Sequence, residues 1–353
     1  MKKLFTQRFA LLPLFLLLLT AVACSKSDDA EDVPSVGDGV PPALEANVLI
    51  TTDDGNIDLH DGDIVAGVGG SGTHLTIGEW GEDTVTVTLL DVDLSAHNGS
   101  PAICCYGNVK IILMGETLVR GGEGSPAVFV AEGQTLTICG DGTLRAEASD
   151  GGASAAIGSG NFGCDYGHCG YIVIAGGTIY AEGSHFVAPA IGAGGVGGHC
   201  DGITISGGSV TAIGHGPNAA IGTALGIDGS GYGRDCGSYC GDITITGGNL
   251  VIDSEDIGIG TGRSEVDNSV CGNITITSGI GYIATPYAER LIGAAKGGRC
   301  GTVTIDGRVV APDDLPRLWD LPADYFPNLV FGKGELEDDV DYYMLLPKPQ
   351  PAE

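Results

Sequence analysis

The sequence predicts an all-β protein folded as a right-handed parallel β-helix, a solenoid of about eight coils with three strands in each coil. Three observations predict this fold. A short alternating string of apolar and polar residues returns about every thirty residues, a Gly-Gly pair or a close relative follows the later copies, and no sustained apolar spacing of helical period occurs after residue 46. We expect the coils to occupy residues 47–310 and a C-terminal cap or tail to occupy residues 311–353.

The first strand of each coil is the most regular element of the repeat. Its string reads Ile-Thr-Ile or a close relative, and the two-residue period of a strand places the aliphatic side chains on one face and threonine on the other. Successive copies lie 24 to 40 residues apart, so the longer coils need loop insertions. The copies are 85–87, 109–111, 136–138, 172–174, 203–205, 243–245, 274–276 and 303–305.

Two further strings complete each coil. A second alternating run follows the glycine pair, as in 178–181, and a third string of the type Ala-Ile-Gly follows it, as in 190–192. Stacking such coils closes an apolar interior and lets each strand pair with its copy in the next coil. The glycine-rich insertions 192–200 and 223–240 are expected at one corner, and loops that gather on one side of a solenoid commonly bind ligands.

The N-terminal segment has the features of an export signal. Residues 1–23 combine a basic start with an apolar stretch too short for a good membrane span. The string Ala-Val-Ala-Cys that ends at Cys24 resembles the lipobox of bacterial lipoproteins, which implies cleavage before Cys24 and lipidation of its thiol; an ordinary signal peptide is the alternative. Residues 24–46 are polar and acidic, as in a flexible tether.

The acidic run after Cys24 also resembles the surface-export signal of Bacteroidetes lipoproteins, although a merely solvated spacer would look similar. This resemblance implies a lipid-anchored protein of the outer membrane, exposed on the cell surface of a Gram-negative bacterium.

The net charge restricts the possible partners. The chain has 16 basic and 45 acidic residues, and removal of residues 1–23 takes away three basic residues and changes the formal charge from −29 to −32. Such a chain repels nucleic acid and anionic lipid, so contact with the membrane is expected only through the lipid anchor. A polyanionic glycan could approach only through bridging cations such as Ca²⁺ or at a locally neutral face.

The cysteines form a pattern across the coils. Five of them precede the first strand at the same place in consecutive coils, where neighbouring copies are about 4.8 Å apart and within reach of a disulfide. Export favours disulfides, and a buried stack of free thiols is the alternative. The ladder comprises Cys169, Cys200, Cys240, Cys271 and Cys300, with Cys164 and Cys236 just upstream of two members. A zinc site is a weaker alternative, built from Cys164, His168, Cys169, His199 and Cys200.

The same fold class includes enzymes such as pectate lyases and polygalacturonases, whose catalytic residues follow recognisable patterns. The string Gly-His-Gly around His215 copies a polygalacturonase string, but the partner carboxylate motifs are missing nearby, which indicates a turn histidine. A lyase needs a calcium-binding carboxylate cluster and a basic residue with a lowered pKa, and the basic residues are scattered. We therefore assign no catalytic residue, and leave a lyase or hydrolase as the alternative.

Two groups of residues are candidates for binding. Acidic residues crowd the first coil and could bind Ca²⁺, unless they are only a solvated cap: Asp53, Asp54, Asp58, Asp61 and Asp63. The outward position of the second strands is expected to hold Arg145, Tyr180, Thr211, Val251 and Tyr282 in successive coils. Of these, Arg145, Tyr180 and Tyr282, with Glu182 and Asp253 beside them, could form an aromatic and polar platform for sugar rings, unless tyrosine is simply a good strand residue. An outward threonine ladder resembles ice-binding solenoids but also suits any strand.

The repeated string from residue 156 to residue 304, in which Ala-Ile-Gly and a glycine loop precede Cys-Gly-x-Ile-Thr-Ile-x-Gly-Gly, resembles the carbohydrate-binding β-helix proteins on the surfaces of gut and cellulolytic bacteria. The resemblance implies a pectate-lyase-like solenoid that binds plant polysaccharide with Ca²⁺ and has no confirmed catalysis. The Asp-Gly-Ile-His calcium strings associated with that family are missing here. We expect a surface lipoprotein that binds a polysaccharide or host glycan without chemistry, with a structural adhesin that binds protein as a further alternative.

Overall fold

The computed structural model of this chain describes residues 45–81, 83–97, 99–160, 167–195, 197–226, 237–265, 267–285, 290–336 and 340–349. From Glu45 onward the chain forms one compact unit. The expected signal peptide, Cys24 and nearly all of the tether lie outside the described residues, as do Cys164 and Cys236.

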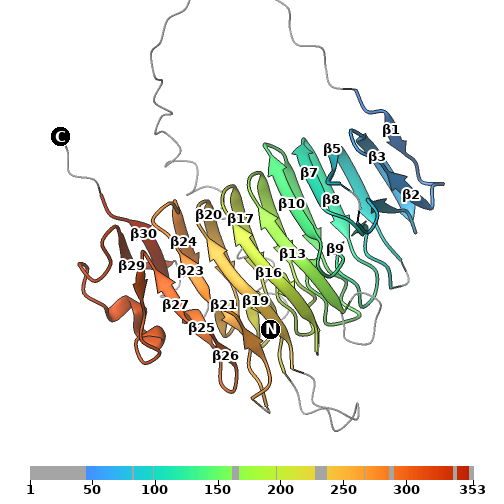
Figure 1. Ribbon diagram of the computed structural model, residues 1–353. Helices are drawn as coiled ribbons and strands as arrows, with labels where there is room; N and C mark the ends of the chain where they lie inside the picture. Colours follow the sequence, from blue (N-terminus) through green and yellow to red (C-terminus); the bar gives the residue numbers. More distant parts are fainter. Residues whose placement is uncertain are drawn as a thin grey trace, which may run out of the picture. The chain divides into compact units, whose positions relative to one another are not determined.

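The expected parallel β-helix is confirmed (Figure 1). Each strand pairs in parallel with the equivalent strand of the next coil, and the third strands make a separate nine-stranded sheet. The described residues therefore contain nine coils. The first and second strands of the coils belong to one bent sheet, and in the long strand β5 they are continuous.

The strands fall into three columns. The first strands are β1 (Val48–Ile50), β3 (Ile64–Ser71), β5 (Val85–Ser95), β7 (Val109–Met114), β10 (Thr135–Gly140), β13 (His168–Ile174), β16 (His199–Ile205), β19 (Tyr239–Ile245), β22 (Val270–Cys271) with β23 (Ile274–Ile276), and β26 (Arg299–Cys300) with β27 (Val303–Ile305). The second strands are β8 (Glu116–Arg120), β11 (Thr143–Glu147), β14 (Thr178–Glu182), β17 (Ser209–Ile213), β20 (Asn249–Asp253) and β24 (Tyr282–Thr285). The third strands are β2 (Asn56–Leu59), β4 (His74–Ile77), β6 (Ile103–Cys105), β9 (Val128–Val130), β12 (Ile157–Gly158), β15 (Ile191–Ala193), β18 (Ala219–Thr223), β21 (Ile257–Thr261) and β25 (Arg290–Ala294).

The repeated Ile-Thr-Ile string builds the core. In β16, for example, Ile203 and Ile205 point inward and are buried, while Thr204 between them is half-exposed. Each inward residue pairs with its copy in the next coil, as Ile203 does with Ile243. A buried aliphatic side chain of this size contributes about 1.5–3 kcal/mol, and this contribution recurs in every coil.

The glycine of the third strand permits the coils to stack closely. Gly192 and Gly222 have φ angles of 126° and 135°, a region that residues with a side chain rarely adopt. A Cβ atom on Gly222 would lie 1.9 Å from the carbonyl oxygen of Gly260 in the next coil. The backbone therefore requires glycine at this bend, which explains why the Ile-Gly string recurs in each of these coils.

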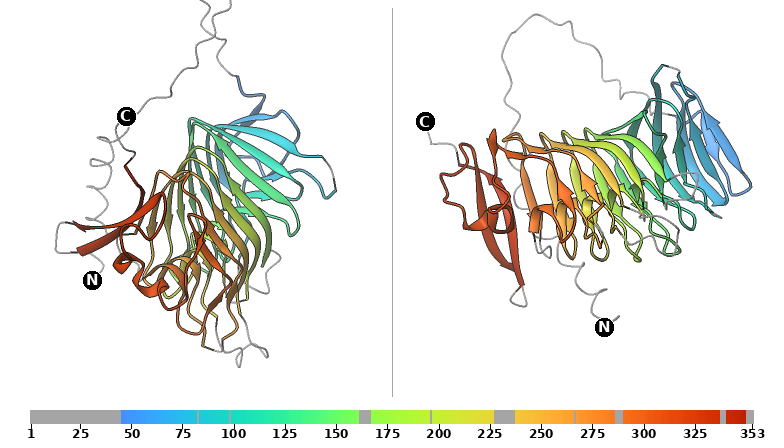
Figure 2. Two further views of the ribbon diagram at one scale, coloured as in Figure 1. Left: turned by 60° about the vertical axis from the view of Figure 1, so that its left-hand side comes forward. Right: turned by 60° about the horizontal axis from the view of Figure 1, so that its bottom comes forward.

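The C-terminal segment ends the parallel stack (Figure 2). It comprises β28 (Arg308–Val309), the 3-10 helix η3 (Leu315–Asp320), β29 (Leu329–Leu336) and β30 (Val340–Pro347). Strand β30 pairs antiparallel with β24, and the buried side chains of Leu318, Leu329 and Leu345 join the core. Among the described residues, no helix has both the length and the apolar character needed to cross a bilayer.

The cysteine ladder has the expected register. Cys169, Cys200, Cys240, Cys271 and Cys300 are partners in consecutive coils. They, Cys105 and Cys139 are free thiols in the structure. The register is the one that both predicted arrangements, disulfides and a buried thiol stack, require.

Candidate functional site

The long insertions lie at one corner of the coil, as the sequence indicated. Insertion 192–200 joins β15 to β16 and insertion 223–240 joins β18 to β19, so both connect a third strand to the following first strand. We call this edge of the solenoid the insertion corner.

Exposed aromatic side chains gather at the insertion corner. Trp80 lies between β4 and β5, Tyr106 lies between β6 and β7, and Tyr171 and Tyr239 lie near the starts of β13 and β19. Their exposed fractions are 68%, 39%, 49% and 41%. We call these four residues the aromatic corner. These four residues were not predicted as binding residues, because outward aromatic side chains were expected on the second strands and these lie elsewhere in the coil.

Glycines leave room for two of these rings. Tyr171 pairs with Gly202 of the next coil, and a Cβ atom on Gly202 would lie 3.4 Å from the Tyr171 ring. Similarly, a Cβ atom on Gly133 would lie 3.9 Å from the ring of Trp80. Each ring therefore lies beside backbone that carries no side chain, and a large part of its surface remains open to solvent.

A polar network connects the aromatic corner. His199 stacks against His168 and Tyr239, with ring centroids 5.4 Å and 4.7 Å apart. The Nε2–H of His199 donates to Asp201 at 3.0 Å, and the other carboxylate oxygen of Asp201 accepts from the Gly133 amide at 2.7 Å. The carboxylate of Asp201 thus connects its own coil to the loop at Gly133, two coils away, and supplies polar atoms beside the aromatic rings.

The residues expected to form a sugar platform on the second strands are engaged with one another. Arg145 lies over the Tyr180 ring, 4.4 Å from its centroid, and forms a short ion pair with Glu147. The Tyr180 hydroxyl donates to Oε2 of Glu182 at 2.8 Å. The guanidinium covers one face of the ring, and burial together with Glu182 raises the pKa of Tyr180. Glycan binding by these residues remains a prediction.

The expected position of Tyr282 is wrong by two residues. Tyr282 pairs with Asn249, and Ala284 occupies the place beside Val251 that was assigned to Tyr282. Five residues separate Ile276 from Tyr282, whereas three separate Ile245 from Asn249. The longer turn preserves the outward face but moves Tyr282 out of the column that contains Tyr180.

Asp253 lies in the same column as Glu182, two coils further along, with Ile213 between them. Burial raises the pKa of Asp253 to about 6, and the nearby charges of Glu182 and Glu255 add to this shift while His215 opposes it. A carboxyl group with a raised pKa is commonly found in functional sites.

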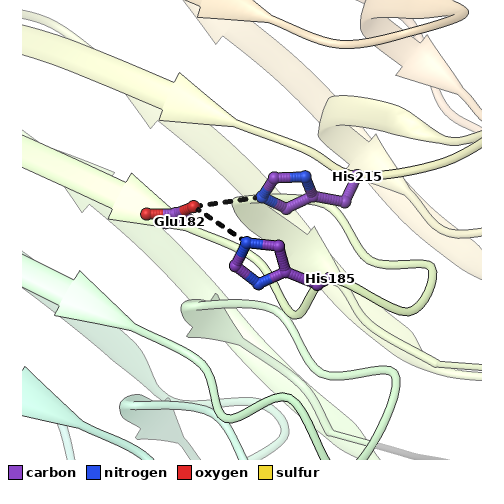
Figure 3. A group of neighbouring side chains, drawn as sticks. All are labelled: Glu182, His185 and His215. Carbon is purple, nitrogen blue, oxygen red and sulfur yellow. Dashed lines mark hydrogen bonds and ion pairs between the residues drawn. The ribbon is translucent and has the colours of Figure 1, made fainter. Parts of the chain in front are cut away.

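Two histidines join this region, and sequence reasoning had placed neither of them there. The Nε2 atoms of His215 and His185 lie 3.1 Å and 3.7 Å from Oε1 of Glu182 (Figure 3). The Nδ1–H of His185 donates to Asp150 at 2.6 Å. A groove of about 430 Å³ borders this cluster, and Asp150, Glu182 and His185 are among its lining residues.

The five aspartates proposed to bind calcium mostly hold turns in the first coils. The Asp54 carboxylate accepts from the Thr51 amide, Asp63 from the His60 amide and Asp61 from the Thr86 amide. Within the described parts of the chain, two groups bring three metal-ligating side chains within 4.8 Å, and both lie elsewhere: Glu182 with His185 and His215, and Glu132 with His199 and Asp201. The structure does not gather Asp53, Asp54, Asp58, Asp61 and Asp63 into one site.

The alternative zinc site built on cysteine and histidine is also not assembled by its described members. Cys169 and Cys200 point into the core and are fully buried, whereas His168 and His199 are on the outer side of the same strands. Adjacent residues of a strand face opposite sides, so these thiols and imidazoles do not converge.

Fold and surface together define a class of protein: a parallel β-helix with exposed aromatic rings at one corner and a histidine-carboxylate cluster beside a groove. No family model, no curated protein and no solved structure matched this chain in the comparisons.

Proposed function

We propose that this protein is a surface lipoprotein that binds a polysaccharide without cleaving it, and that the aromatic corner is the binding surface. The proposal rests on one observation: the rings of Trp80 and Tyr171 lie beside glycines of other coils and remain 68% and 49% exposed. Exposed rings of this kind can stack on sugar rings. The carboxylate of Asp201 and the ring of His199 add hydrogen-bonding groups beside them.

The charge of the protein favours a neutral glycan. The chain beyond residue 23 carries a formal charge of −32, and the carboxylates of Glu132 and Asp201 place part of that charge at the aromatic corner. A polyanionic glycan would be repelled unless cations bridged it. Next to Trp80, a groove of about 750 Å³ is lined by Asp58, Asp61 and Glu79, among others, and is the place where Ca²⁺ could assist binding.

Affinity electrophoresis in gels that contain neutral or anionic polysaccharides tests this proposal. We expect retention by a neutral polysaccharide, with Kd increased about 5- to 30-fold in each of Trp80→Ala and Tyr171→Ala, which corresponds to about 1–2 kcal/mol of stacking. Phe186→Ala is the matched control, because Phe186 is 73% exposed and lies after β14, away from the aromatic corner. Parallel gels with a chelator measure any contribution of Ca²⁺.

Unchanged retention in the Trp80 and Tyr171 variants would place binding elsewhere, with the second-strand residues as the next region to substitute. Absence of retention by every polysaccharide would contradict the proposed function and favour a protein partner.

A polysaccharide lyase or hydrolase is the second candidate. It is favoured by Asp253, whose pKa of about 6 would let it act as a proton donor, and by the carboxylate of Glu182 two coils away. New reducing ends or unsaturated products from pectic or host polysaccharides, lost in Asp253→Asn, would support this candidate over non-catalytic binding.

A further inference from the structure

We propose that Glu182, His185 and His215 form a binding site for a divalent transition metal ion, with Zn²⁺ as the best-suited ion. The ligand atoms would be Oε1 of Glu182 and the Nε2 atoms of the two histidines (Figure 3). This proposal is independent of glycan binding at the aromatic corner.

The distances between the ligand atoms fit such an ion. Zinc bonds of about 2.0–2.1 Å in a tetrahedral arrangement place two ligand atoms about 3.3 Å apart. The Oε1 atom of Glu182 lies 3.1 Å from Nε2 of His215 and 3.7 Å from Nε2 of His185. The imidazole rings stack at 19° with centroids 4.2 Å apart, so their in-plane lone pairs run side by side and one ring must turn before both nitrogens reach a common ion. The side chain of His185 is 61% exposed and has room to turn, and the ligand atoms of the three residues already lie within 4.8 Å of one another.

Neighbouring residues orient these ligands. Asp150 accepts a hydrogen bond from Nδ1–H of His185, which leaves Nε2 of that ring as the metal-binding atom. Tyr180 donates to Oε2 of Glu182, which leaves Oε1 free to face the histidines. Carboxylate and hydroxyl partners of this kind commonly support metal ligands in proteins.

Binding of a cation at this cluster requires a proton to leave the nitrogen that faces Glu182. His215 donates Nε2–H to Glu182 in the metal-free arrangement. Binding of Zn²⁺ at Nε2 would require this proton to leave that atom: a neutral ring would carry its proton on Nδ1 instead, and a doubly protonated ring would release one proton to solvent.

The donor set indicates the kind of ion and its coordination. Two imidazoles and one carboxylate suit Zn²⁺ and related ions, whereas Ca²⁺ prefers six to eight oxygen ligands. Three protein ligands leave a fourth position open. Glu182 and His185 line the groove of about 430 Å³, so water or a ligand oxygen from the groove could occupy that position.

The second group of possible metal ligands in the described residues can be compared with the proposed zinc site. Glu132, His199 and Asp201 contain only one imidazole, whereas the proposed site contains two. The second oxygen of Asp201 accepts from the Gly133 amide. We therefore expect this group to bind Zn²⁺ more weakly.

Isothermal titration of the chelator-treated full chain with ZnCl₂, and separately with CaCl₂, tests the site. We expect one Zn²⁺ per chain with a Kd below about 10 μM and no comparable Ca²⁺ binding at this site. His215→Gln should weaken Zn²⁺ binding by more than about 100-fold and Asp150→Asn by about 10- to 100-fold. His199→Gln is the matched control and should bind Zn²⁺ like the unmodified chain. Circular dichroism checks that each variant is folded, and Asp150 is exposed enough for its substitution to be tolerated.

Binding of Co²⁺ in place of Zn²⁺ separates this site from the cysteines. Tetrahedral Co²⁺ without a sulfur-to-metal charge-transfer band is expected, since all three proposed ligands are nitrogen or oxygen. Strong thiolate bands, a Kd weaker than about 10 μM, or equal Zn²⁺ affinity in His215→Gln and Asp150→Asn would overturn the assignment. Trp80→Ala should keep full Zn²⁺ affinity and His215→Gln should keep polysaccharide retention, so failure of one proposal leaves the other intact.

Discussion

His185 and His215 lie on neighbouring coils with ring centroids 4.2 Å apart and ring planes inclined by 19°. The stack forms because the turn after β14 and the turn after β17 are equivalent positions of the repeat. Both rings face the carboxylate of Glu182, so one ion bound by all three side chains would join the two coils.

Zinc should therefore stabilise the folded protein. At a concentration of Zn²⁺ about 100 times Kd, linkage predicts about 2.7 kcal/mol of added stability and a rise in Tm of a few degrees. The rise should disappear in His215→Gln and at pH 5, where protons compete for the imidazoles. Differential scanning fluorimetry with and without Zn²⁺ measures it, and an equal shift in His215→Gln would argue for binding elsewhere.

Asp253 should make stability depend on pH in a defined direction. Its pKa is about 6 in the folded protein and 3.8 as the ordinary value, so the folded state disfavours the ionised carboxylate. The contribution of Asp253 to stability is complete below about pH 4 and is lost as the pH rises through 6. Asp253→Asn should thus raise the free energy of unfolding by about 2–3 kcal/mol at pH 7.5 and by little at pH 4.

Urea unfolding at several pH values checks this prediction. Asp313→Asn, which changes an exposed carboxylate of the C-terminal segment, is the control and should keep the profile of the unmodified protein. A difference for Asp253→Asn that grows toward low pH would contradict the burial of this carboxyl group.

The glycine of the third strand should tolerate no side chain. Gly222→Ala places a Cβ atom 1.9 Å from the Gly260 carbonyl oxygen in a backbone region unfavourable for alanine, so we expect a loss of several kcal/mol or failure to fold. Gly55→Ala is the control, because its Cβ would meet no atom within 4 Å. Soluble yield and the urea midpoint distinguish the two variants.

The ladder thiols should be unreactive in the native protein. Cys169, Cys200 and Cys240 are fully buried, and burial is the main cause that raises the pKa of Cys169. Labelling with iodoacetamide should modify these cysteines only after unfolding, as peptide mass spectrometry can determine. Recovery of ladder cysteines in disulfide-linked peptides would instead support the bridged form.

Cys24 should determine whether the protein is recovered in the membrane fraction or in soluble fractions. If its thiol is lipidated, Cys24→Ser should move the protein from the outer-membrane fraction into soluble fractions without changing its circular dichroism. Protease added to intact cells should digest the unmodified protein if it faces outward. Membrane retention of Cys24→Ser would contradict the lipid anchor.

The repeat in the sequence was sufficient to predict the fold, because the same alternation and the same Ile-Gly bend return in each coil. Tyr282 was misplaced because its turn has two additional residues, an even number that preserves the face of the strand while changing its neighbour. The contact between His215 and Glu182 was also missed because it depends on how neighbouring coils align. A coil offset of 31 residues pairs Glu182 with Ile213, which places His215 just beyond the equivalent of Glu182. The alignment of the two coils was therefore enough to predict that His215 lies near Glu182, whereas the Gly-His-Gly string was not.

The column of cysteines at residues 169, 200, 240, 271 and 300 has an odd number of members. Disulfides between neighbours in the column can therefore join at most two pairs, and one cysteine is left unpaired. Which cysteine is left depends on which neighbours pair. If the protein is exported into an oxidising compartment, the timing of coil closure matters, since a chain that folds before its thiols meet an oxidant keeps all five cysteines in the same reduced state.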